Sequence, residues 1–299
     1  MRLGISAPSD SVFAIQPFGT GGPSGCSFLS DVQLDSGRPA EVTRCQWITS
    51  GNTTDHGVSI SRTWAPAFAP RAVALIGTTL PVGLAVACTF RPDGTVGTAY
   101  DDYTVTGDSV LGTVVALPSG VRIVVFLQPD TFTDACTGAM LSFYNHGDVS
   151  VADGAEFELG EFWVSDAVTL ACEPGWSDEE SDPTLIDQSE AAQPFTQRGY
   201  PARILRFTPG VRAQTDVYGT DAEDAAMDFE ELFAKLDRGQ QALYVPRWID
   251  GAGAIDPRLA NRTARIGTCR KLPGQRHISA GWFGHAECEV IEAPGLPAE

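Results

Sequence analysis

The sequence predicts a mainly β protein, built around an antiparallel β-sandwich or jelly roll, with a smaller α+β portion that contains one clear helix. Gly (31) and Pro (20) make up about a sixth of the 299 residues, above an average usage of roughly 12%. This excess favours many turns over a helical bundle. Short runs that favour strands also recur between turn signals such as Pro-Asp-Gly at 92–94 and Pro-Ser-Gly at 118–120.

The first two segments differ in pattern. Residues 1–54 are rich in Ser, Gly, Thr and Pro, and we expect an extended arm with short strands such as 41–48. Residues 55–172 are expected to form the sandwich. The run at 121–128 is apolar at nearly every position, so that strand should be buried on both faces. The candidate strands of the sandwich are 58–64, 72–77, 84–90, 103–106, 109–117, 121–128, 139–144 and 156–165.

Residues 173–193 contain seven acidic residues and no basic one, which predicts a long exposed loop or linker. A calcium loop would need Asp-x-Asp-x-Asp-Gly spacing, which this segment lacks. Aromatic residues are enriched in protein interfaces, and they also stack on sugars. We therefore single out a candidate contact site for a partner protein or a glycan, with simple packing of the tryptophan as the alternative: Trp176, Asp178, Glu179 and Glu180.

Residues 194–299 are expected to form the α+β domain. Thr220 and Glu223 make a capping box, an apolar stripe with helical spacing follows, and Gly239 closes a predicted helix over 221–238. Strands are expected at 201–208, 241–248, 263–271 and 280–292.

The formal net charge is −18, from 38 acidic and 20 basic residues. Nucleic-acid binding and docking on anionic membranes both need clustered Lys and Arg, so this balance argues against both. No apolar run approaches the ~20 residues that span a bilayer. The N-terminus lacks the unbroken apolar run of a secretory signal, which favours synthesis and assembly in a cytoplasm.

No pattern of catalytic, cofactor-binding or metal-binding residues emerges. The seven cysteines are dispersed without a Cys-x-x-Cys pair, which predicts free, mostly buried thiols. His-Glu-x-x-His, Gly-x-Ser-x-Gly, phosphate-loop and Gly-x-Gly-x-x-Gly motifs are absent. A glycan-cleaving enzyme would need two carboxylates across a cleft. The candidates Glu156, Glu158 and Glu161 follow one alternating strand, with an irregularity expected at Gly160.

Three stretches resemble the minor tail and baseplate structural proteins of tailed bacteriophages. They are SFLSDV at 27–32 followed by VTR at 42–44, RAVALIGTTLP at 71–81, and FELGEFWV at 157–164. Arg203 and Arg206, the predicted helix and the final CEVIE at 288–292 follow in the same order as in that family. Thr78–Thr79 departs from the family pattern, which has Asn there. The resemblance covers nearly the whole chain.

The resemblance implies a non-enzymatic, distal-tail-like virion part with a galectin-like or jelly-roll sandwich. Its expected partners are other tail or baseplate proteins and copies of itself, in a ring with three-fold or six-fold symmetry. The expected location is the virion tail, after assembly in the host bacterial cytoplasm. The alternative function is a carbohydrate-binding module that recognises a host surface glycan.

Overall fold

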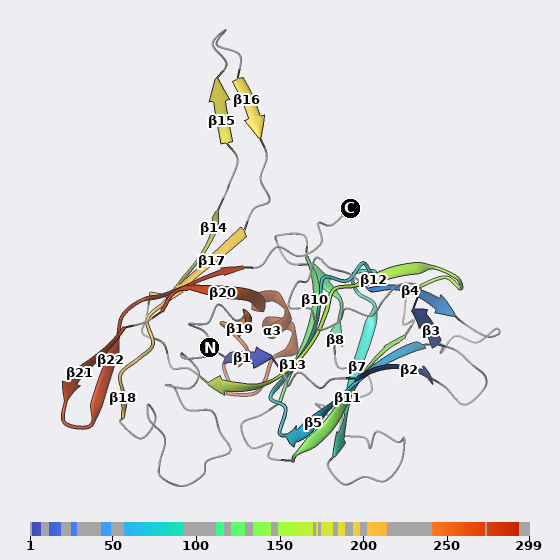
Figure 1. Ribbon diagram of the computed structural model, residues 1–299, viewed down its shortest axis with the longest axis horizontal. Helices are drawn as coiled ribbons and strands as arrows, with labels where there is room; N and C mark the ends of the chain where they lie inside the picture. Colours follow the sequence, from blue (N-terminus) through green and yellow to red (C-terminus); the bar gives the residue numbers. More distant parts are fainter. Residues whose placement is uncertain are drawn as a thin grey trace. The chain divides into compact units, whose positions relative to one another are not determined.

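Figure 1 shows the computed structural model, which folds into two compact units. The N-terminal unit is built mainly from Arg2–Ala167 and Val245–Ala264, and the C-terminal unit from Val168–Tyr244 and Arg265–Pro294. The structure describes residues 2–6, 12–18, 25–28, 43–48, 57–92, 112–116, 121–128, 134–144, 149–169, 172, 175–181, 185–188, 194–197, 202–213, 241–272 and 274–292.

Two antiparallel sheets form the N-terminal unit, as the composition and strand spacing predict. The first has the order β1 (Arg2–Ser6), β13 (Glu161–Thr169), β6 (Ala72–Ile76), β10 (Arg122–Leu127) and β9 (Val115–Ala116). The second has the order β2 (Val12–Phe18), β5 (Gly57–Phe68), β11 (Cys136–Tyr144), β7 (Ala85–Pro92) and β8 (Gly112–Thr113). A third, smaller sheet joins β12 (Glu156–Leu159), β4 (Thr43–Ile48) and β3 (Gly25–Phe28).

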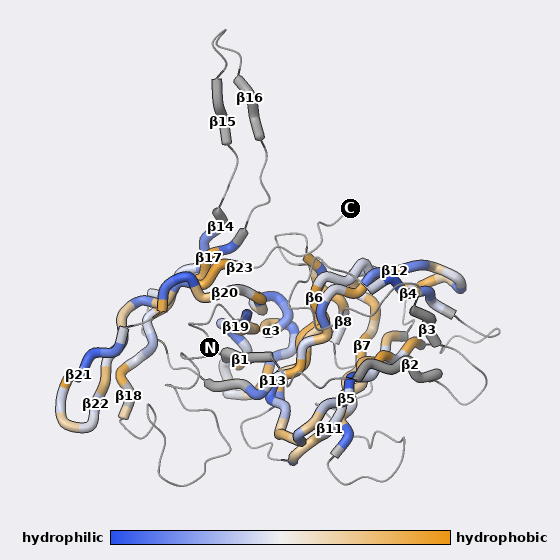
Figure 2. The backbone as a smooth tube through the Cα atoms, viewed as in Figure 1, coloured by the Kyte–Doolittle hydropathy of each residue, from blue (hydrophilic) through white to orange (hydrophobic). Residues whose placement is uncertain are grey.

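Strands of all three sheets contribute to one hydrophobic core. Successive side chains of a strand point to opposite faces, so alternate residues face this core. Val73 and Leu75 come from β6, and Leu141 and Phe143 from β11. Figure 2 shows the resulting hydrophobic stretches, in orange, around β7 and β13. The expected mainly β, antiparallel fold is therefore confirmed, whereas the jelly-roll or galectin-like type stays a prediction.

The strand at 121–128 is buried on both faces, as expected. Ile123, Val124 and Val125 are each at most 1% exposed. The helix α3 (Pro257–Thr263) packs against β10, while Val124 and Phe126 belong to the core cluster. The apolar periodicity of the sequence does not predict α3, although Asp256 provides an N-cap and Pro257 follows it.

The separate arm expected for residues 1–54 differs from what the structure shows. Strand β2 pairs with β5, and β4 pairs with β12. Cys45 and Trp47 of β4 are fully buried in the core cluster. Alternate residues of β4 face the core, namely Thr43, Cys45 and Trp47. The sequence did not reveal this face, because the pattern is short and polar residues surround it.

The C-terminal unit contains a sheet with the order β14 (Ser177–Ser181), β17 (Ala202–Phe207), β23 (Cys288–Glu292), β20 (Arg265–Lys271) and β19 (Gln241–Val245). β15 (Leu185–Gln188) pairs with β16 (Pro194–Gln197). The expectation of a long loop over 173–193 was therefore wrong, because β14 and β15 lie in it. Pairing with arginine-bearing β17 offsets the acidic repulsion of β14.

A three-stranded sheet of β18 (Arg212–Ala213), β22 (Trp282–His285) and β21 (Gln275–Ser279) completes the C-terminal unit. The predicted helix 221–238 and the predicted strand 103–106 lie outside the described residues. Within the described part of the chain, no helix has the length and apolar character needed to cross a membrane.

Candidate interaction surface

Two of the four predicted contact residues belong to an ion-pair network on the C-terminal sheet. The Asp178 carboxylate accepts hydrogen bonds from Arg203 at 2.9 Å and from Arg265 at 3.3 Å. The Glu179 carboxylate accepts one from Arg206 Nη1 at 2.5 Å. These partners lie on β17 and β20, so the two acids tie β14 to its own sheet.

Arg206 lies between two carboxylates. Its Nε donates to Glu289 on β23 at 2.9 Å, on the side opposite Glu179. The Arg206 hydrogen bond lowers the pKa of Glu179, with a smaller contribution from Ser177. Hydrogen bonds to Glu289 and then to Glu179 raise the pKa of Arg206. Both effects favour the charged forms of Glu179 and Arg206.

The structure places the other two predicted residues beside this network. Trp176 is half-buried immediately before β14. Glu180 lies on β14 opposite Arg203 in the strand register, and its side chain is outside the described part of the structure. The predicted site is thus contiguous in space. Asp178 and Glu179, however, are engaged within the chain, so they are poor candidates for contacts with a partner.

Among the described residues of the C-terminal unit, the strongest exposed apolar feature is the hairpin of β21 and β22. Every residue of β21 is exposed, and Ile278 and Trp282 are each 49% exposed. Trp282 and Gly284 share a face because they alternate along β22. A Cβ built on Gly284 would lie 2.6 Å from Ile278 Cδ1, which puts Ile278 on that same face. We call Ile278 and Trp282 the apolar ridge.

Polar groups and an open strand edge border the apolar ridge. Arg276 pairs with Gly284 in the strand register and therefore shares the face of the ridge. On the opposite face, His277 packs edge-on against Phe283, with ring centroids 5.5 Å apart. Among the residues that the structure describes, β21 is the outermost strand of its sheet, so one row of its backbone groups has no neighbouring strand there.

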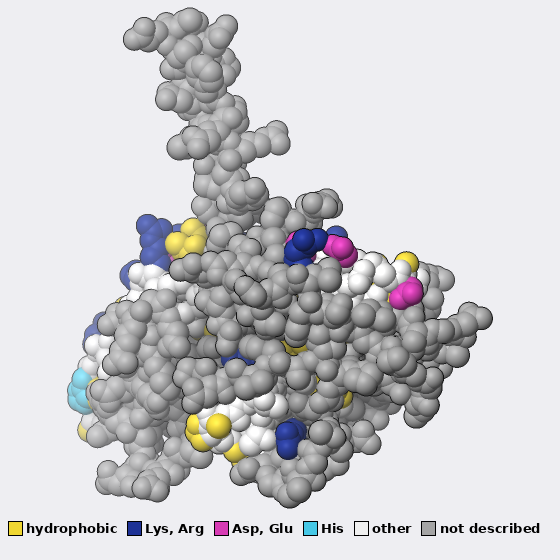
Figure 3. Space-filling view, turned by 45° about the vertical axis from the view of Figure 1, so that its right-hand side comes forward, with side chains coloured by type: hydrophobic (Ala, Val, Ile, Leu, Met, Phe, Trp, Pro, Cys, Tyr) yellow, Lys and Arg dark blue, Asp and Glu magenta, His cyan; other side chains and the backbone are white. Residues whose placement is uncertain are grey.

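Figure 3 shows basic and hydrophobic side chains together with a histidine along the left-hand margin of the molecule. The histidine belongs to the hairpin, because His277 and His285 are the only histidines whose side chains the structure describes. The hairpin thus combines an aromatic residue, an aliphatic residue and positive charge. This composition resembles the core of a protein interface more than ordinary surface.

The six cysteines whose side chains the structure describes form no disulfide bond with one another. Cys45, Cys88, Cys136 and Cys288 are buried, as expected from the sequence, and Cys172 and Cys269 are half-buried. Within the described ranges, no group of three His, Cys, Asp or Glu residues is arranged to hold a metal ion. Glu156 of the candidate carboxylates is paired with Arg44 of the neighbouring strand, and Glu161 is buried.

Comparisons of this chain with protein families, curated proteins and solved structures found no match.

Proposed function

We propose that this chain is a non-enzymatic structural component of a bacteriophage tail tip or baseplate, which joins neighbouring virion proteins and copies of itself. The apolar ridge carries the proposal. A half-exposed tryptophan beside a half-exposed isoleucine leaves apolar surface in water that a partner would cover. The assignment to a phage tail rests on the sequence resemblance at 27–44, 71–81 and 157–164.

The open edge of β21 suggests how such a contact forms. An added strand from a neighbouring chain can pair with exposed backbone groups, while side-chain contacts supply specificity. A ring of copies requires two different surfaces of one subunit to meet. The hairpin would provide one of these surfaces, and Arg276 would favour an acidic counterpart on the next subunit.

The experiment replaces both ridge residues with serine (Ile278→Ser and Trp282→Ser) in phage particles whose own copy of the gene has been deleted. We expect a loss of infectious particles at least tenfold larger than that caused by the matched control Ile249→Ser. Ile249 is 40% exposed and lies outside the hairpin. Normal assembly by the double variant, or a parent protein that is absent from purified virions, would contradict the proposal.

Recognition of a host surface glycan is the second candidate. Trp282 favours it because an exposed aromatic ring with a neighbouring Arg276 is a suitable platform for a sugar. A glycan array distinguishes the two functions. Binding that disappears in Trp282→Ala, in particles that still assemble, supports recognition. An array without hits, together with failed assembly, supports the structural role.

A further inference from the structure

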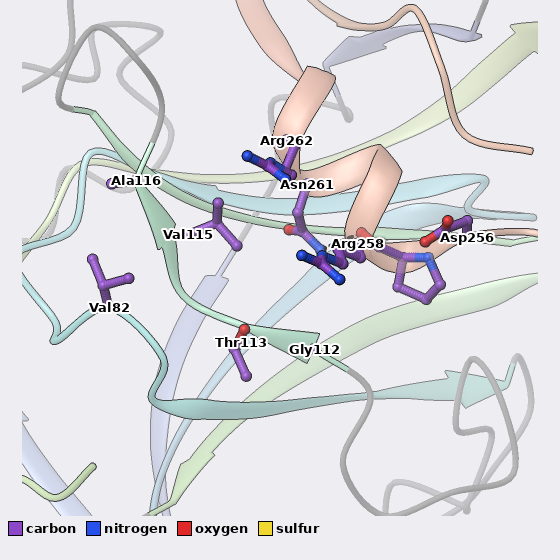
Figure 4. Close-up of a pocket in the computed structure, with 10 residues that line it drawn as sticks. Val82, Gly112, Thr113, Val115, Ala116, Asp256, Arg258, Asn261 and Arg262 are labelled. Atoms are coloured by element: carbon purple, nitrogen blue, oxygen red, sulfur yellow. Dashed lines mark hydrogen bonds between the residues drawn. The ribbon is translucent and has the colours of Figure 1, made fainter. Parts of the chain in front are cut away.

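A pocket of about 690 Å³ lies in the N-terminal unit, beside the helix α3. Its walls come from α3, from the strands β8 and β9, and from the turn that contains Val82 (Figure 4). The size is within the range of roughly 300–1,000 Å³ that is usual for ligand sites. The lining residues are Val82, Gly112, Thr113, Val115, Ala116, Asp256, Pro257, Arg258, Asn261 and Arg262.

Two arginines give the pocket its charge. Arg258 and Arg262 are four residues apart on α3, so they share one face of the helix. In Figure 4 both side chains extend from α3 toward the strands on the opposite wall. Both residues are exposed, and Arg258 has no ion-pair partner among the residues that the structure describes. The only acidic residue in the lining, Asp256, already accepts the Leu259 N–H at 3.0 Å as the helix N-cap.

The helix that carries these arginines is held firmly. Asn261 is 2% exposed, and its Oδ1 accepts the backbone N–H of Val125 at 2.5 Å. Its Nδ2 donates to the carbonyl of Pro257 at 2.7 Å. At the end of the helix, the Thr263 hydroxyl lies 2.7 Å from the carbonyl of Arg247. A fixed helix lowers the entropy lost when a ligand binds to its side chains.

The wall facing the arginines is mainly apolar. Val82 is 51% exposed, Val115 is half-buried, and Thr113 adds one hydroxyl group. Inorganic phosphate alone would leave this wall uncovered. A carboxylate on an apolar stem would pair with the Arg258 guanidinium group and also cover the valines.

The charge of the whole chain makes this pocket exceptional. The chain has a net charge of −18, whereas the lining of this pocket contains two arginines and one acidic residue. A second copy of the chain has 38 acidic residues against 20 basic ones, so it offers more carboxylates than cations. The pocket is therefore complementary in charge to acidic proteins.

We propose that the pocket between α3 and the β8–β9 strands binds an acidic peptide segment of a neighbouring protein, with a carboxylate held by Arg258. The protein nature of the ligand rests on the proposed function. The preference for a carboxylate does not rest on that function, because it can be tested on the free chain. The two proposals can therefore fail separately.

The test titrates the full chain by calorimetry with a capped Leu-Glu-Leu-Glu-Leu peptide and with its Leu-Gln-Leu-Gln-Leu counterpart. We expect the glutamate peptide to bind at least tenfold more tightly. Arg258→Gln should weaken this binding about tenfold, because a charge-assisted hydrogen bond is worth roughly 1.5 kcal/mol. The matched control Arg270→Gln, at an exposed arginine of the other unit, should leave it unchanged.

A second variant, Val82→Glu, places a carboxylate at the pocket and should abolish binding while the melting temperature stays unchanged. Glutarate distinguishes the possible sources of the carboxylate. Glutarate binding as tight as that of the peptide would overturn a peptide ligand in favour of a small organic acid. Equal binding of the two peptides, or peptide binding that Arg258→Gln leaves intact, would overturn the carboxylate site itself.

Discussion

Single side chains decide how the acidic segment behaves. Sequence reasoning identified Asp178 and Glu179 as unusual, because they lie in a stretch without bases. It could not identify their partners, because Arg203, Arg206 and Arg265 are at least 25 positions away and only strand pairing brings them close. Arg62 illustrates the same difficulty. It shares the face of the core residues Ile60 and Trp64 on β5 and is 1% exposed, with its Nη1 2.5 Å from the Phe162 carbonyl.

Arg206→Gln should raise the pKa of Glu179. The folded-state pKa of Glu179 is lowered, so its stabilising effect is present above the unfolded-state pKa and disappears as the pH falls through the folded-state value. NMR titration of the Glu179 carboxyl carbon measures the midpoint directly. Arg270→Gln is the matched control, because Arg270 pairs with Glu289 and not with Glu179. An unchanged midpoint in Arg206→Gln would contradict the assigned hydrogen bond.

Cys88 and Cys288 should resist alkylation in the folded protein. Burial raises the pKa of the Cys88 thiol, and a hydrogen bond with Cys269 followed by burial raises that of Cys288. The thiolate is the reactive form, so iodoacetamide at pH 8 should label both residues far more slowly than in urea. Mass spectrometry of peptides after timed quenching gives the rates. Equal labelling rates with and without urea would show that the two thiols are accessible.

Elements with clear periodicity were predictable, and short or polar ones were not. The strands predicted at 72–77 and 121–128 are present as β6 and β10. Their continuous apolar runs were sufficient to predict them. The predicted irregularity at Gly160 separates β12 from β13. The helix α3 has seven residues, too few for a stripe, and only Asp256–Pro257 marks its start. The sequence QRHIS of β21 has no apolar alternation, which hid the candidate interaction surface.

Asn261→Ala should destabilise the N-terminal unit by about 1–3 kcal/mol, because the buried Val125 N–H would lose its acceptor. Alanine favours helix, so a loss of stability cannot come from helix propensity. Urea unfolding measures the change. Arg258→Ala is the control on the same helix, and we expect an effect within about 0.5 kcal/mol for this exposed site. Equal effects of the two variants would contradict the role of Asn261.

Gly267→Ala should disrupt the pairing of β20 with β23. A Cβ at this position would lie 2.3 Å from the Ile291 carbonyl oxygen, so the backbone would have to move. Overpacking of this kind costs about 1–3 kcal/mol. Thermal unfolding compares this variant with Gly274→Ala, whose Cβ would meet nothing within 4 Å. If both variants melted at the parent temperature, the close approach of the two strands would be wrong.

The two units are interleaved along the chain, and neither composition nor local sequence pattern could reveal this. The N-terminal unit is completed by Val245–Ala264, after the chain has passed through part of the C-terminal unit. The sequence placed the end of the sandwich at 172, close to the observed boundary at Ala167. The sequence analysis assigned residues 245–264 to the other domain. The helix α3 covers a face of β10, but the two elements are about 130 residues apart, and no local pattern links them.

A fragment of residues 1–244 should therefore be less stable than one of residues 1–264. The shorter fragment lacks α3 and leaves the outer face of β10 uncovered. We expect it to bind more of the dye ANS and to unfold at lower urea concentration. Both fragments lack β20 and β23, so the comparison isolates the contribution of 245–264. Identical unfolding of the two fragments would contradict this role of α3.

The interleaving also has a consequence for synthesis on the ribosome. Strand β10 emerges long before α3, and about 100 residues separate the end of β13 from the end of α3. At a translation rate of ~5–20 residues per second, one apolar face of the nascent sheet stays exposed for on the order of 5–20 s before α3 covers it. During that interval the growing chain would be a client for chaperones. A synonymous slowdown within codons 170–240 should lower the soluble yield without altering the finished protein.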